Sequence, residues 1–113
     1  MIARERVLAL ATFVLDSGLD AAKRQLVSEA KSGNQTSRLL LNVIGLSLQG
    51  KRTSTADLRE TLTLEEAAGV VGQAIDCRST HPTADGLVES LLLNNMPVET
   101  AIRHLGESYY VAD

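Results

Sequence analysis

The chain has 113 residues, of which 44% are hydrophobic, 22% charged and 3% aromatic, and its formal net charge is -3. This composition excludes an intrinsically disordered chain, and the length suffices for one apolar core but not for two. Because aromatic residues are so few, the core must be built from Leu, Val, Ile and Ala, which favours closely packed helices over a sheet. We therefore expect a single all-α domain over residues 1–113.

The cellular location follows from the cysteine count and the apolar runs. Cys77 is the only cysteine, so no internal disulfide can form, and the N-terminal residues lack the pattern of a secretory signal. The apolar run within residues 39–48 is much shorter than the ~20 residues that cross a bilayer. We expect a cytoplasmic protein of bacterial or phage type, without a membrane span.

Two helices are predicted first. Apolar side chains recur every three or four positions over residues 7–15, and Gly18 follows as a stop signal, which predicts a helix over 3–16. Asp20 is then expected to cap a second helix, over 20–32.

The next segment predicts the centre of the fold. Residues 37–50 are apolar on most of the helical circumference, which is typical of a helix surrounded by others. A later helix, over 64–77, has an unusually smooth surface, against which we expect Gly45 of the central helix to pack closely. Its small residues are Ala67, Ala68, Gly69, Gly72 and Ala74.

Two capping signals precede that smooth helix. Ser54 predicts the start of a short helix over 55–61. Thr63 and Glu66 have the three-residue spacing of a capping box, in which each side chain binds the backbone N–H of the other residue.

Prolines predict the start of the last two helices, over 83–94 and 97–106. The sum is a compact bundle of six to seven short helices with short loops, for which stacked helical hairpins are one plausible arrangement. No segment predicts a strand.

Few side chains in the sequence suggest catalysis. Cys77 and His81 are four residues apart, a spacing that would place them on one face of a helix, but Pro82 disfavours helical geometry at His81. We interpret Cys77 as a semi-buried residue near a helix end. No catalytic, metal-binding or cofactor-binding residue is assigned, and an enzyme, which would depend on Cys77, His81 and His104, is only a third hypothesis.

Charge is distributed unevenly along the chain. Residues 1–52 hold eight Lys or Arg and four Asp or Glu, or +4, whereas residues 53–113 hold three and ten, or -7. A polyanion would therefore be expected to bind residues 1–52, and a basic partner residues 53–113. If the protein binds nucleic acid, the expected residues are Arg4, Arg6, Lys23, Arg24, Lys51 and Arg52.

The sequence "VETAIRHLGES", residues 98–108, resembles the first helix and turn of bacterial helix-turn-helix regulators. The resemblance implies a DNA-binding transcriptional regulator. In that pattern a small residue lies four positions before the turn glycine, whereas here Ala101 lies five before Gly106 and Ile102 holds the required position. The recognition helix would begin near Ser108. That segment is acidic and has too few residues to supply the three or four side chains that contact DNA bases.

The two tyrosines near residue 110 indicate a different function from DNA binding, namely contact with another protein. Tyr109, Tyr110 and Val111 form an apolar tail and, with Arg103, are the residues we expect to bind a partner, although the tyrosines could instead cover the end of the core. The favoured hypothesis is a small protein-binding module without catalytic activity: an adaptor, an inhibitor or an assembly subunit. Its partner is another protein of unknown identity, a homodimer is compatible with this, and nucleic acid is less favoured.

Overall fold

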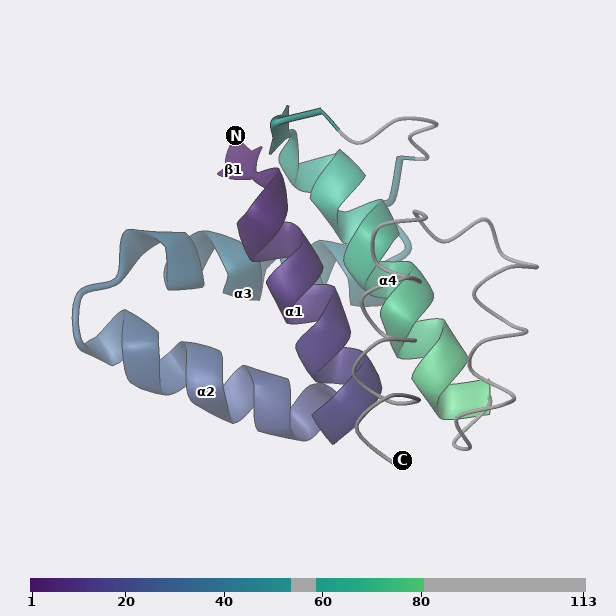
Figure 1. Cartoon of the computed structure of the whole chain (residues 1–113), viewed down its shortest axis with the longest axis horizontal. Coiled ribbons are helices and arrows are strands. Elements are labelled where there is room, and N and C mark those ends of the chain that lie inside the picture. The colour runs from purple at the N-terminus through teal and green to yellow at the C-terminus, as the bar shows by residue number, and fades with distance from the viewer. Residues whose placement is uncertain (54–58, 81–113) are drawn as a thin grey trace, which may run out of the picture.

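Figure 1 presents the computed structural model of the chain, which describes residues 1–53 and 59–80. Its helices account for most of these residues, so the all-α class is confirmed. In chain order the elements are β1 (Ile2–Ala3), α1 (Arg4–Ser17), α2 (Leu19–Lys31), α3 (Gln35–Leu48), β2 (Thr61–Leu62) and α4 (Leu64–Thr80).

The helix count is lower than predicted. Four helices, and not six to seven, are present in the described part of the chain. The predicted helices over 83–94 and 97–106 lie outside it, and residues 59–61, at the described end of the helix predicted over 55–61, are not helical. No helix among the described residues has the length and apolar character needed to cross a membrane.

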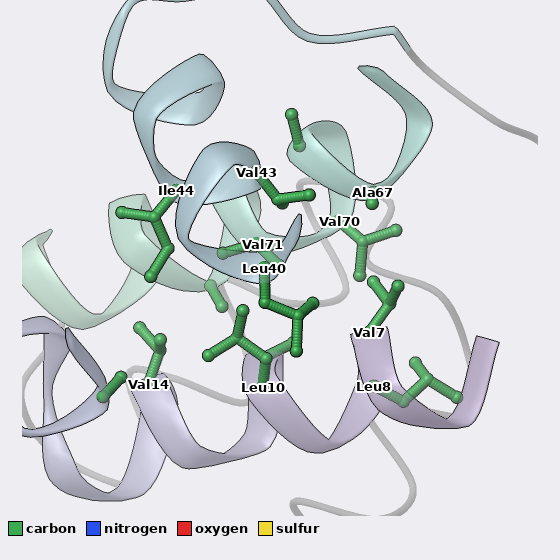
Figure 2. Close-up of a cluster of buried hydrophobic side chains, with 14 of the residues drawn as sticks. Val7, Leu8, Leu10, Val14, Leu40, Val43, Ile44, Ala67, Val70 and Val71 are labelled. Atoms are coloured by element: carbon green, nitrogen blue, oxygen red, sulfur yellow. The ribbon is translucent and has the colours of Figure 1, made fainter. Parts of the chain in front are cut away.

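The core forms where three helices meet. In Figure 1, α1 and α4 lie side by side; α4 also packs against α3, while α2 packs against α3 and, less extensively, α1. Figure 2 shows apolar side chains of α1, α3 and α4 pointing toward one another, among them Leu10, Leu40 and Val71. Each of these three residues is at most 5% exposed.

The smooth helix was predicted correctly, but its partner was not. Ala67, Ala68 and Ala74 are completely buried. A Cβ added at Gly45 would meet no atom within 4 Å, so no neighbour packs closely there. The close approach is instead at Gly69, where an added Cβ would lie only 2.6 Å from the carbonyl oxygen of Thr53.

The predicted central position of α3 is also wrong. Leu48 is 53% exposed, and Leu39, Leu41 and Leu46 are only partly buried. α3 packs mainly against α2 and α4, and α1 and α4 likewise each pack against two of the other described helices. A nearly continuous apolar circumference therefore did not identify a helix enclosed on all sides.

The helix ends agree with the predicted capping and stop signals, with one exception. Gly18 adopts a φ of 91° after α1, and its N–H donates to the carbonyl of Val14. Asp20 does not cap α2, because the helix begins one residue earlier and Asp20 lies in its first turn. The capping box before α4 is confirmed: the backbone N–H of Thr63 donates to the Glu66 carboxylate at 3.0 Å, and the N–H of Glu66 donates to the Thr63 hydroxyl at 3.1 Å.

A small antiparallel sheet contradicts the expectation of no strands. Ile2 pairs with Leu62 and Ala3 with Thr61, and the N–H of Arg4 donates to a carbonyl just before β2 at 2.8 Å. Ile2 and Leu62 are both buried. The ladder ties the first residues of the chain to the segment that leads into α4.

Candidate protein-binding groove

The outer face of α1 holds an exposed aromatic side chain. Phe13 is the only phenylalanine of the chain and is 37% exposed, although the neighbouring Thr12 and Val14 are buried. It lies one turn beyond Ala9 on the same side of the helix, since residues three to four apart share a face. An exposed aromatic ring beside a small residue leaves a hollow next to it.

That hollow is a groove of about 110 Å³ between three helices. Four of its residues come from α1, four from α2 and one from α3. They are Arg6, Ala9, Leu10 and Phe13; Ala22, Gln25, Leu26 and Glu29; and Leu40. The surface is mostly apolar, and its charged groups are Arg6 and Glu29. We call it the α1–α2 groove.

Glu29 is held in place by hydrogen bonds from two helices. The hydroxyl of Ser37, a buried residue of α3, donates to its Oε1 at 2.6 Å, and Nε2 of Gln25 donates to its Oε2 at 2.8 Å. These bonds, the one from Ser37 above all, lower the pKa of Glu29, and the positive charge of Arg6 adds a smaller effect in the same direction. The groove therefore has an ionised carboxylate near neutral pH.

Arg52, one of the predicted nucleic-acid contacts, follows α3, and its side chain lies against α4. Its Nε donates to the carbonyl of Ser47 at 3.0 Å, and its Nη1 donates to the carboxylate of Asp76 at 2.6 Å. Its side chain passes so close to Gly72 that a Cβ there would overlap it. The guanidinium is thus used to attach the end of α3 to α4.

The other basic candidates are spread over the fold. Arg4 and Arg6 lie on α1, Lys23 and Arg24 on α2, and Lys51 just after α3. Only Arg6 of these lines the α1–α2 groove. These five basic residues therefore lie on two helices and in the loop after α3, and not on one element.

The predicted partner-binding residues, Tyr109, Tyr110, Val111 and Arg103, lie outside the described residues, as do His81 and His104. Cys77 lies in α4 and is 1% exposed, so it is more deeply buried than expected. Within residues 1–53 and 59–80, no three His, Cys, Asp or Glu side chains lie close enough together to bind a metal ion.

Sequence reasoning missed the groove, although one signal for it was present. The buried positions of α1 include Leu10 and Val14, whereas Phe13 lies off the face that they define. A large aromatic residue outside the apolar stripe of an amphipathic helix is a reason to suspect a contact surface. The contribution of α2 could not be foreseen, because it depends on how α2 packs beside α1.

Comparisons with known proteins give no family for this chain: no protein-family model matches it, and neither a curated protein nor a solved structure matches.

Proposed function

We propose that this chain is a small protein-binding module, an adaptor, inhibitor or assembly subunit without catalytic activity, and that it contacts its partner through the α1–α2 groove. The observation that carries the proposal is Phe13, an aromatic side chain left exposed beside an apolar groove. Full burial of an exposed apolar side chain stabilises by about 1.5–3 kcal/mol, and a binding partner that covers the exposed 37% of Phe13 would supply about a third of that amount.

The arrangement of the groove supports the same function. Its apolar part, around Leu10, Leu26 and Leu40, is bordered by Arg6 and Glu29. An apolar centre with a polar rim is the usual composition of a protein interface, in which the rim orients the partner. Because three helices form the groove, the surface exists before the partner arrives.

A helix-turn-helix-like DNA-binding regulator is the alternative, and the charges of the described residues support it less. Residues 1–53 and 59–80 hold ten Lys or Arg and eight Asp or Glu, a net charge of only +2. Arg52 is paired with Asp76 and Arg59 with Glu66. A gel-shift assay at low salt tests this alternative: a shift that weakens steeply with added salt would favour DNA binding.

The protein-binding proposal is tested by placing a photo-crosslinking amino acid at Gln25, which lines the groove. Gln49, an exposed residue at the end of α3, is the matched control position. In cells that produce the protein, we expect an adduct with a polypeptide from position 25 and none from position 49. Phe13→Asp should abolish the adduct while leaving the helical circular-dichroism signal unchanged. Absence of any polypeptide adduct at position 25, or equal yields at both positions, would refute the proposal.

A further inference from the structure

The residues that line the α1–α2 groove have the spacing that surrounds an inserted helical side chain. On α1 they are Arg6 and the residues three, four and seven positions after it, and on α2 they are Ala22 and the residues at the same three steps. Four residues at these positions form the hole into which one side chain of a facing helix packs. Each wall of the groove therefore has the pattern that accepts a side chain from a third helix.

The backbone around the groove favours a helical occupant over an extended one. Most of the lining residues, such as Leu10 and Leu26, lie inside α1 and α2, where backbone N–H and C=O groups are bonded within the helix. An extended segment takes backbone hydrogen bonds from the surface it binds, as it does at the edge of a sheet. A helix satisfies its own backbone and contributes side chains alone, which is what this groove can receive.

The floor of the groove suits one bulky apolar side chain. Leu10, Leu26 and Leu40 are buried there, and Figure 2 shows Leu10 and Leu40 pointing toward each other. The groove volume is about 110 Å³, which is somewhat less than the ~150 Å³ of an engineered cavity that holds benzene. One leucine, methionine or phenylalanine side chain of a partner fills it, with the exposed ring of Phe13 beside it.

The two charged groups of the groove are not equally available to a partner. Each carboxylate oxygen of Glu29 already accepts a hydrogen bond, one from Ser37 and the other from Gln25. Arg6 is exposed and makes no hydrogen bond or ion pair within residues 1–53 and 59–80, although its charge acts on Glu29 at longer range. A guanidinium group binds a carboxylate through paired N–H donors. The charge that a partner can match is therefore the positive charge of Arg6.

We infer that the α1–α2 groove binds an acidic amphipathic helix of another polypeptide. One bulky apolar side chain of that helix packs on the leucine floor beside Phe13, and an Asp or Glu about one turn away pairs with Arg6. The spacing follows from α1, because Arg6 precedes Ala9 and Leu10 by one turn, or about 5 Å along the helix axis. This inference rests on the proposed function and specifies the chemistry of the partner.

The adduct formed at position 25 provides the first test. Mass spectrometry of the adduct identifies the partner segment that is joined to the groove. We expect a segment with apolar residues at helical spacing and an Asp or Glu three or four residues from a bulky apolar one. The inference is overturned if the joined segment lacks a carboxylate at that spacing, or if it belongs to a second copy of this chain or to residues 81–113 of the same chain.

Exchange of the two charges provides the second test, with a labelled synthetic peptide of the joined segment and fluorescence anisotropy. Arg6→Glu should weaken binding of this peptide by at least about tenfold, because two carboxylates then face each other. Replacing the acidic residue of the peptide with Lys should weaken binding to the wild type and restore binding to Arg6→Glu. That restoration also shows that the variant is folded. Arg24→Glu, at an exposed position of α2 outside the groove, is the matched control and should leave the affinity unchanged.

A third variant tests the apolar part of the groove without changing any charge. Ala9→Leu places a larger side chain in the groove, so it should abolish binding of the same peptide while the helical circular-dichroism signal is kept. Unchanged binding to Ala9→Leu would show that the peptide lies elsewhere and would overturn the inference.

The outcomes separate this inference from the proposed function. If position 25 gives an adduct with another polypeptide but Arg6→Glu binds its peptide as tightly as the wild type does, the acidic helix is refuted and the protein-binding function stands. If position 25 gives no polypeptide adduct, the proposed function is refuted and this inference with it.

Discussion

Ser37 and Glu29 connect α3 to α2 through a hydrogen bond of 2.6 Å between the hydroxyl and the carboxylate. Ser37 is completely buried, whereas Glu29 lines the α1–α2 groove. The bond therefore holds one wall of the groove against the core.

Loss of this hydrogen bond should destabilise the fold. We expect Ser37→Ala to lower the free energy of unfolding by about 1–2 kcal/mol, because the acceptor is charged and the donor is buried. Urea denaturation measures the change. Ser28→Ala, at an exposed position of α2, is the control and should have little effect. Equal stabilities of the two variants would contradict the structural role of the bond.

Acid should destabilise the protein through two carboxylates. The pKa of Glu29 is lowered by Ser37 and Gln25, and that of Glu66 by the backbone N–H of Thr63 and by Arg59. A carboxyl group whose pKa is lower in the folded than in the unfolded state contributes stability above its unfolded value, and this contribution disappears as the pH falls through the folded value. The free energy of unfolding should thus be flat near neutral pH and decrease below the ordinary value of 4.5.

The same pH series can separate the two groups. Ser37→Ala removes the main cause of the lowered pKa of Glu29, so the decrease below pH 4.5 should be shallower in this variant. Glu66→Gln should remove the other part of the decrease. If both variants kept the wild-type pH dependence, the acid sensitivity would have to come from other carboxylates.

Two glycines should respond in opposite directions to the same substitution. Gly45→Ala should raise the free energy of unfolding by up to about 1 kcal/mol, because a Cβ there meets nothing within 4 Å and alanine favours the helix. Gly69→Ala should lower it, since the Cβ would lie 2.6 Å from a backbone oxygen of Thr53. Thermal denaturation of both variants provides the comparison. A stabilising Gly69→Ala would show that the Thr53 segment does not lie against α4.

Gly72 and Arg52 should be energetically coupled. An added Cβ at Gly72 would meet the Arg52 side chain, whose three nearest atoms are all closer than 3 Å. Gly72→Ala should therefore displace the guanidinium from Asp76 and destabilise the protein. In an Arg52→Ala background the same change should cost less, by about 0.5–3 kcal/mol in a double-mutant cycle. Additive effects would show that Arg52 does not lie across this glycine.

Local features could be predicted from the sequence, whereas tertiary contacts could not. The capping box of Thr63 and Glu66 was found because its two bonds join residues only three apart. The small side chains on the surface of α4 were also recognised from the sequence. However, Gly45 was predicted to pack against them, whereas the close contact is made by the Thr53 backbone. The spacing of residues shows that one surface of a helix has only small side chains, but it does not show which other segment packs against that surface.

The β ladder and the groove escaped prediction for related reasons. Each strand has two residues, too few for an alternating pattern, and Ile2 pairs with a residue sixty positions later. The groove needs α1 and α2 to lie at a particular angle. The basic candidates had the same limitation, since the contact of Arg52 with Asp76 of α4 joins residues far apart in the sequence.

The packing of α1 on α4 determines when the first helix can dock during synthesis. The helix ends at Ser17, but α4, its principal partner among the described elements, begins only at Leu64. A growing chain that has reached the end of α3 therefore keeps side chains such as Val7 without the α4 surface, including Val70, that lies beside them in the fold. The α2–α3 contacts join neighbouring segments and can form earlier. Because α1 precedes α4 in the chain, its packing is completed only after α4 has been synthesised, and its apolar side chains are exposed to aggregation during that interval.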